Sequence, residues 1–237
     1  MGTSLQAAPG SPAWRYLTGE RGLPADLVKQ AVACDRLREG PQGSMWAAHS
    51  DSAGALTGWE ERGPAWRGFA TDGAKELFRF GPGRICITEA AIDAMSLAAI
   101  EVLRPDTLYV STGGGWSPAT DEAIRGLAKR ANARLVAATD NNRQGDVYAD
   151  RVRAIAAEAS ARYARSRPRA DDWNEDMKAL ISGARAFAGS GFLLPTRNGE
   201  LLRWCLRNGL RVVQPMTLMS MGLYSEPAGA FMPSIIY

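Results

Sequence analysis

The 237-residue sequence is poor in histidine, cysteine and lysine, and the first two shortages exclude classes of site. His49 is the one histidine, so a Ser-His-Asp triad or a histidine-rich zinc site would have to use it. Cys34, Cys86 and Cys205 are scattered and odd in number, which argues against a disulfide framework and favours a reducing, cytoplasmic compartment. No apolar run reaches the roughly 18 residues of a spanning helix, so we expect no membrane partner.

Positive charge comes mainly from arginine. The four lysines leave 24 arginines among the 28 basic residues, and the formal net charge is +3. Because arginine contacts phosphate through two parallel hydrogen bonds, this composition favours a polyanionic partner such as nucleic acid. A GC-rich genome would give the same Ala- and Arg-rich composition, and this alternative stays open.

Three segments of the sequence differ in pattern. Residues 1–80 hold short helical and extended stretches broken by glycine and proline, which predicts a small mixed α+β region. Residues 81–182 alternate apolar strands with helices, which indicates an α/β fold with a parallel sheet flanked by helices. Residues 183–237 form an accessory C-terminal tail. The predicted strands of the middle segment cover 84–88, 107–111 and 134–138, and its predicted helices cover 89–103, 120–131 and 146–161.

The ends of these three strands carry the residues best suited to chemistry. Glu89 follows the first strand, the glycines at 113–115 follow the second, and Asp140 follows the third. Right-handed crossovers place such ends on one edge of a sheet, where ligands bind. Carboxylates suit Mg²⁺, with Mn²⁺ as an alternative, and glycines let backbone amides approach a phosphate. The pattern therefore predicts a metal and phosphate site, with Gly113, Gly114 and Gly115 as its phosphate-binding residues.

Three further polar residues lie close to these ends. Asp93 shares a helix face with Glu89 at i+4, and we expect it to support the site rather than to bind the ion. Asn142 points the same way as Asp140 in an extended chain and offers an oxygen without charge, while Asp146 could supply the missing charge. In the competing interpretation, Glu89 and Asp146 are acids that merely stabilise helix N-termini.

Four motifs together identify a family resemblance. They occupy residues 87–94, 111–114, 140–146 and 172–175, and in this order they resemble the Toprim domain of topoisomerases, bacterial primases and related nucleases. The sequence is most similar to Toprim-like proteins of plasmids and mobile elements, in which a domain of unknown function precedes the Toprim module. Residues 14–80 resemble that preceding domain.

The resemblance implies Mg²⁺-dependent phosphoryl chemistry on nucleic acid. It gives Glu89 the role of general acid/base or metal ligand and makes Asp140 the first acid of an Asp-x-Asp motif, so these two are the expected catalytic residues. Asn142 stands where the family has the second acid, and Asp172 matches a later acid. The implied metal ligands are thus Glu89, Asp140, Asn142 and Asp172.

Three functions follow as hypotheses. The first is phosphoryl or nucleotidyl transfer, or strand nicking, on DNA rather than RNA during plasmid replication or mobilisation. The second is a catalytically impaired nucleic-acid-binding module, because Asn142 lacks the charge of the second acid. In both, Arg143, Arg165 and Arg167 are expected to contact the nucleic acid.

The third hypothesis, an acetyltransferase, comes from the tail. Residues 191–237 are similar to the C-terminal end of some GNAT-type acetyltransferases, without the turn that binds coenzyme A. The tail is also rich in apolar side chains, which predicts packing against the rest of the chain, self-association or a protein partner.

Overall fold

The computed structural model describes residues 6–185, 202–203 and 206–207. The chain divides into two compact units, residues 1–181 and 182–237, and every strand described below belongs to the first. The acetyltransferase-like tail and its apolar stretch lie outside the described residues except for these few positions. None of the described helices has the length and apolar character needed to span a bilayer.

The N-terminal part of the first unit is a set of short helices followed by antiparallel strands. Ser11 begins the first helix, because its hydroxyl accepts the Trp14 N–H and Pro12 occupies the first helical position. The helical elements are α1 (Pro12–Arg15), the π-helical turn η1 (Tyr16–Glu20) and α2 (Ala25–Ala33). The strands are β1 (Leu37–Glu39), β2 (Met45–Ser50), β3 (Leu56–Arg62), β4 (Arg67–Phe69) and β5 (Leu77–Phe80).

The following part alternates strands and helices, as predicted. Its elements are β6 (Arg84–Thr88), α3 (Ala91–Ile100), β7 (Thr107–Ser111), α4 (Pro118–Ala128), β8 (Arg134–Ala137), α5 (Arg143–Glu158), β9 (Arg162–Arg165) and α6 (Trp173–Arg185). Strand β6 pairs in parallel with both β7 and β8, and β8 pairs in parallel with β9. The predicted α/β class with a parallel sheet flanked by helices is confirmed. Strand β9 and helix α6 were not predicted.

A single sheet of nine strands joins the two parts. Its order is β4-β3-β2-β5-β7-β6-β8-β9, with β1 paired to β2. Strand β5 pairs antiparallel with β7, so that Phe78 lies opposite Ser111. Hydrogen bonding in the sheet is therefore continuous across residue 80, where the sequence predicts a domain boundary, and the N-terminal strands hold residues against the parallel part.

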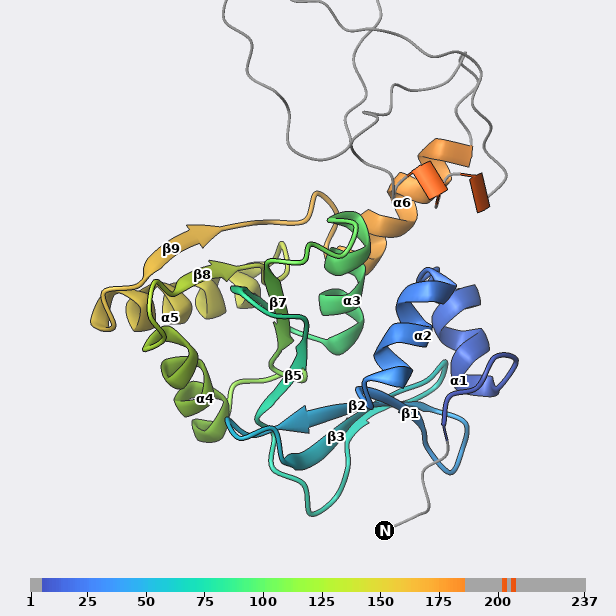
Figure 1. Ribbon diagram of the computed structural model, residues 1–237, viewed down its shortest axis with the longest axis horizontal. Coiled ribbons are helices and arrows are strands. Elements are labelled where there is room, and N and C mark those ends of the chain that lie inside the picture. The colour runs from blue at the N-terminus through green and yellow to red at the C-terminus, as the bar shows by residue number, and fades with distance from the viewer. Residues whose placement is uncertain (1–5, 186–201, 204–205, 208–237) are drawn as a thin grey trace, which may run out of the picture. The chain divides into compact units, whose positions relative to one another are not determined.

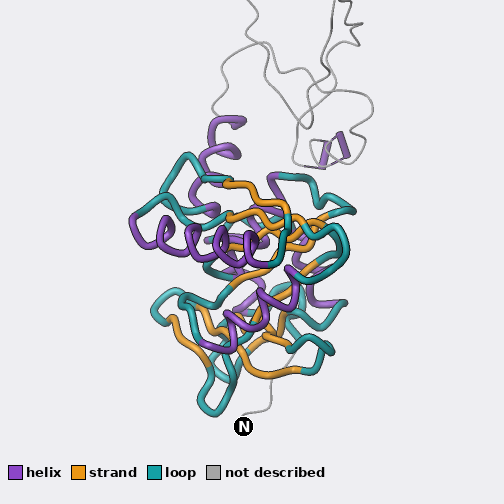
Figure 2. Tube along the Cα trace, turned by 90° about the vertical axis from the view of Figure 1, so that its left-hand side faces the viewer, coloured by secondary structure: helices purple, strands orange, loops and turns teal. Residues whose placement is uncertain are grey.

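Alternate residues of the central strands pack into two different apolar layers. Ile85 and Ile87 of β6 face a cluster with α4 and α5, whereas Cys86 faces a cluster with α3, α2 and α6. Figure 1 shows this division, with α4 and α5 on one side of β7 and α3 on the other. Figure 2 shows from the side that strands of the parallel part run between helices. Each fully buried aliphatic side chain in these layers contributes about 1.5–3 kcal/mol.

Helix α3 is the most deeply buried helix near the strand ends. All of its residues from Ala91 to Ala98 are buried, and Ile92 and Met95 pack in the same cluster as Leu27 of α2 and Met177 of α6. Because the N-terminus of this helix follows β6 directly, its burial fixes the backbone on which Glu89 lies.

Candidate acidic site at the carboxyl ends of the parallel strands

Three segments that are distant in the sequence are hydrogen-bonded together at the ends of the parallel strands. The backbone N–H of Asp140, after β8, donates to Oε1 of Glu89, after β6, at 3.2 Å. The next N–H, of Asn141, donates to the carbonyl oxygen of Asp171 at 2.8 Å. Asp172, the next residue after Asp171, therefore lies at the same edge of the sheet as Glu89 and Asp140. The sequence predicts this shared edge for Glu89 and Asp140, the two acids that follow strands.

The acids of this edge repel one another because they are close and partly removed from water. Burial, followed by the charges of Glu89 and Asp172, raises the pKa of Asp140 from 3.8 to about 7. Burial also raises the pKa of Glu89. Asp93 is almost fully buried, and burial together with the charges of Asp172 and Asp140 holds its pKa well above the ordinary value. The fold thus brings several carboxyl groups close together without enough nearby positive charge to offset their repulsion.

Glu60 of β3 shows why Glu89 is not needed to cap helix α3. The Ala91 N–H, at the start of α3, donates to Oε2 of Glu60 at 3.1 Å, and Glu60 is fully buried. Arg62 Nε donates to the other carboxylate oxygen of Glu60 at 2.9 Å. Since Glu60 supplies the acceptor at this helix end, the Glu89 carboxylate is free to face Asp140. The interpretation of Glu89 as a helix-terminal acid loses support here.

The donor set suits a hard cation, although no closed cluster is formed. Among the described residues, no three His, Cys, Asp or Glu side chains are positioned together as a ready metal site. Asp140 nevertheless has a buried Oδ1 for which the described part of the chain provides no hydrogen-bond partner, and it has Glu89 and Asp172 beside it. Oxygen ligands of this kind are those that Mg²⁺ binds, and a divalent cation would offset their repulsion. The residues present therefore fit the ion.

Asn142 has a structural task in this arrangement. Its Oδ1 accepts the Gly145 N–H at 2.9 Å, which makes Asn142 the N-cap of α5. The predicted second position of the Asp-x-Asp pair is thus occupied by a capping side chain. Asp146, one turn into α5, forms ion pairs with Arg167 at 2.6 Å and Arg165 at 3.6 Å.

The glycine loop after β7 is held by backbone bonds and by a close side chain. Gly113 and Gly114 adopt positive φ angles of 68° and 74°, and the Gly114 N–H donates to the Glu89 carbonyl oxygen at 2.7 Å. A Cβ atom at Gly113 would lie 2.8 Å from Cε1 of the buried His49 ring. Two cations are nearby, because a Cβ at Gly114 would be 3.4 Å from an Arg62 nitrogen and one at Gly115 would be 3.6 Å from Lys75 Nζ. Phosphate binding by this loop stays a prediction.

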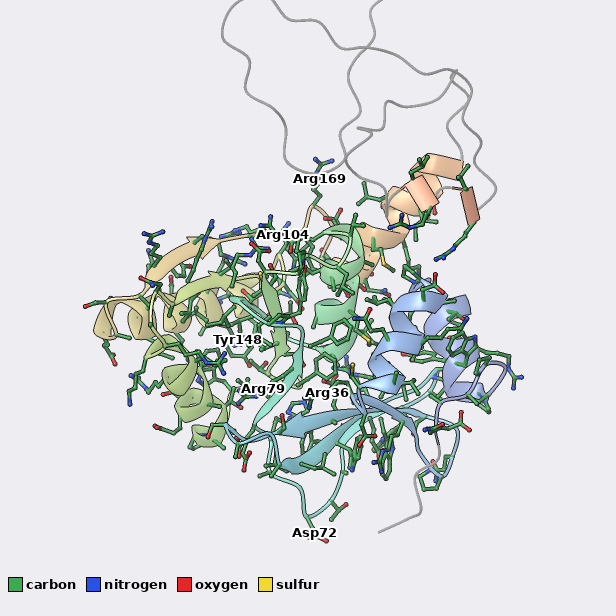
Figure 3. The ribbon with its side chains drawn as sticks, in the orientation of Figure 1. Arg36, Asp72, Arg79, Arg104, Tyr148 and Arg169 are labelled. Carbon is green, nitrogen blue, oxygen red and sulfur yellow. The ribbon has the colours of Figure 1, made fainter. Side chains whose placement is uncertain are left out.

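The arginines predicted to contact nucleic acid differ in how they are engaged. Arg165 is half-buried and donates to four backbone carbonyl groups near the ends of β8 and β9, which are those of Ala137, Thr139, Asp140 and Ser166. Arg143, at the start of α5, is exposed, and Arg167 is exposed apart from its ion pair with Asp146. Figure 3 shows Arg169, on the loop between β9 and α6, pointing outward.

An aromatic pair, Tyr148 and Trp116, lies near the acids. The ring of Tyr148, labelled in Figure 3, stacks on Trp116 with centroids 5.5 Å apart, and the Arg151 guanidinium lies 5.8 Å from the Tyr148 ring. Burial, followed by the charge of Glu89, raises the pKa of Tyr148. This stack connects α5 with the segment that follows the glycine loop.

Asn174 joins the N-terminal part to the acidic edge, and sequence reasoning gave it no role. Its Nδ2 donates to the Arg21 carbonyl oxygen at 2.8 Å and to Ser96 Oγ at 3.0 Å. Glu60 and Arg62 were also missed. The signal for Asn174 was its place in the Asp-Trp-Asn motif, whereas nothing in the pattern of β3 marks Glu60 as a residue of this edge.

Comparison with solved structures returns primases at low identity. The primase fragment of the bacteriophage T7 primase-helicase protein is 18% identical, with a TM-score of 0.48 over 78% of each chain. The Aquifex aeolicus primase is 14% identical, with a TM-score of 0.48 over 69% of this chain and 53% of the primase chain. The RNA polymerase domain of the Mycobacterium tuberculosis primase is 15% identical, with a TM-score of 0.43 over 81% and 83%. No curated protein matches the sequence.

Two family matches cover most of the described chain. Residues 86–177 match the family described as Toprim-like, and this stretch contains Glu89, Asp140 and Asp172. Residues 15–85 match the family described as a protein of unknown function, DUF3991, and this stretch contains Glu60 and Arg62. The resemblance stated from the motifs is confirmed: the chain carries a Toprim-like domain preceded by a DUF3991 domain.

Proposed function

We propose that this protein carries out Mg²⁺-dependent phosphoryl or nucleotidyl transfer, or strand nicking, on nucleic acid, with DNA rather than RNA as the substrate. The Toprim-like match supports a nucleic-acid-related function. The observation that carries the proposal is the meeting of Glu89, Asp140 and the segment of Asp172 at one edge of the sheet. We propose plasmid replication or mobilisation as the setting of this reaction, and the similarity of the motifs to those of plasmid-type Toprim-like proteins supports this choice.

Each acid has a distinct part in this proposal. Glu89, Asp140 and Asp172 would hold the cation, which when bound neutralises phosphate charge and orients the attacking oxygen. Glu89 Oε1 accepts one backbone N–H, and burial raises the pKa of this carboxyl, which suits a group that takes up and releases a proton during the reaction. Asp93, buried behind them, supports the negative field of the site.

Cations near the glycine loop would receive the phosphate. Arg62 and Lys75 reach the loop from the DUF3991 domain, on the side of Gly114 and Gly115. Their charges are suited to a phosphate that also contacts the cation held by the acids. The reaction site would therefore need both domains of the chain.

A second candidate function is nucleic-acid binding without catalysis. The observation that favours it is the capping role of Asn142, which leaves the Asp-x-Asp pair with one carboxylate and keeps its amide oxygen on the Gly145 N–H. In that case, affinity for DNA would fall with salt but would not respond to Mg²⁺.

Glu89→Gln tests the catalytic proposal, and Glu175→Gln is a matched control because Glu175 is exposed and lies in the neighbouring Asp172–Glu175 motif. We expect Glu89→Gln to abolish Mg²⁺-dependent nicking or primer synthesis while its unfolding curve stays cooperative. Glu175→Gln should keep the wild-type rate. Equal activity of Glu89→Gln and wild type would refute the proposal, and salt-sensitive, Mg²⁺-indifferent binding without any turnover would establish the second candidate.

A further inference from the structure

A cavity of about 410 Å³ lies beside the acidic edge and is walled mainly by the DUF3991 domain. The turn between β3 and β4, the N-terminal helical turn η1 and the start of α3 all contribute to it. Its lining includes Tyr16, Arg21, Arg62, Trp66, Arg67 and Asp172. A volume of this size accommodates a small ligand such as a nucleotide.

Trp66 gives this cavity an aromatic surface that is open and fixed in position. Trp66 is 62% exposed, and among the described residues it is the one aromatic residue in the group of exposed large apolar side chains. Its Nε1 donates to Glu61 Oε2 at 3.1 Å. The ring lies over Gly68, where an added Cβ would come within 3.1 Å of it. An exposed ring that is held in this way is suited to stack on a nucleobase.

Three arginines line the same cavity, together with the acids Asp93 and Asp172. Arg62 donates through Nε to Glu60, and its Nη2 lies beside the glycine loop, 3.4 Å from the position of a Cβ atom at Gly114. Arg21 is fixed by Tyr16, because its Nε donates to the phenol oxygen at 2.8 Å. Arg67 is exposed on β4. This charge pattern favours an anionic ligand, and arginine suits phosphate in particular.

We propose that the cavity is a nucleotide subsite, in which a base stacks on Trp66 and the phosphate contacts Arg62 and Arg67 on the side of Asp172. The proposal deepens the proposed function and rests on it for the neighbouring reaction. The nucleotide has two sources with the same chemistry, a free nucleoside triphosphate or the end of a single strand. The DUF3991 domain would then supply the substrate contacts and the Toprim-like domain the acids.

Binding measured without turnover tests this inference. ATP and a short single-stranded oligodeoxynucleotide are titrated separately into the full chain by calorimetry, with Ca²⁺ in place of Mg²⁺. Trp66→Ala should weaken binding of the probe by about 5- to 150-fold, because base–aromatic stacking has that range of strengths. Trp66→Phe should keep most of the affinity, since a phenyl ring still stacks. Arg67→Gln should also weaken binding, and inorganic pyrophosphate should compete.

The control is Arg153→Gln, because Arg153 is an exposed arginine on α5 that is paired with Asp150 and does not line the cavity. Preference for ATP would identify the free nucleotide as the ligand, and preference for the oligonucleotide would identify the strand end. Unchanged affinity of Trp66→Ala for both probes, or no binding of either probe to wild type, would overturn the inference. Because binding is measured in Ca²⁺ without turnover, failure of the nucleotide subsite can be distinguished from failure of the proposed activity, which Glu89→Gln tests.

Discussion

Replacing Asp140 by Asn should make the protein more stable while it weakens the proposed metal site. Asp140 is partly buried, and its Oδ1 has no hydrogen-bond partner among the residues that the structure describes. Glu89 and Asp172 lie close enough to repel its charge. An asparagine has nearly the same shape and no charge, so it removes this repulsion without leaving a cavity. Residues kept in an unfavourable state at a site of function are expected to show this opposition between stability and activity.

The size of the effect follows from the pKa of Asp140. A rise from 3.8 to about 7 corresponds, at 1.36 kcal/mol for each pH unit, to about 4 kcal/mol. Screening by solvent at a partly exposed carboxyl reduces this to about 2 kcal/mol. Because the native pKa lies above the unfolded one, the native state binds more protons between these values, so stability falls as the pH rises from about 4 to about 7. The penalty is complete above about pH 7.

Urea unfolding at about pH 8 and about pH 4 measures the effect. Asp140→Asn should gain about 2 kcal/mol at the higher pH, which is about 4–8 °C in Tm, and almost nothing at the lower pH. Asp106→Asn is the control of opposite sign, because the hydrogen bond from Arg104 lowers the pKa of Asp106 to about 2. A variant of Asp140 that is less stable than wild type at both pH values would refute the reasoning.

Three further predictions concern the supports of the site. Glu60→Ala should lower the free energy of unfolding in urea by about 3–5 kcal/mol, because Arg62 Nε and the Ala91 N–H both lose their acceptor. Glu60→Gln should lower it less, and equal losses in the two variants would contradict this reasoning. Gly145→Ala should lower Tm, because the new Cβ would meet the Asp140 carbonyl oxygen at 2.1 Å, whereas Gly126→Ala, with open space in α4, should gain up to about 1 kcal/mol. Asn142→Asp should leave stability within about 0.5 kcal/mol, because Asp caps a helix as well as Asn, and should tighten Mg²⁺ binding in calorimetry; unchanged Mg²⁺ affinity would exclude position 142 from the metal site.

The parallel strands could be predicted closely because burial on both faces leaves a continuous apolar run. The strands at 84–88 and 107–111 have the predicted bounds. Strand β9 was missed because its arginines and partly exposed positions at the sheet edge carry no apolar pattern. Helix α5 begins at Arg143, before the predicted start at 146, because Asn142 caps it.

The convergence of Glu89 and Asp140 could be predicted from chain topology alone, because a right-handed crossover leaves few choices for the ends of parallel strands. The contribution of Glu60 could not, since its partner Ala91 is 31 residues away and belongs to another domain. For Arg165, the sequence suggests a ligand contact where the structure shows a contact within the chain. An arginine in a basic run predicts a phosphate contact, but here tertiary structure supplies four carbonyl acceptors.

Binding of Mn²⁺, followed by the loss of its free electron-spin-resonance signal, tests the acidic site most directly, because it needs no substrate and no turnover. The wild-type chain should take up Mn²⁺ in competition with Mg²⁺, and Glu89→Gln, Asp140→Asn and Asp172→Asn should each weaken that uptake, whereas Glu175→Gln should not. Uptake that is absent from wild type, or unchanged in all three variants, would contradict the existence of a shared cation site at this edge.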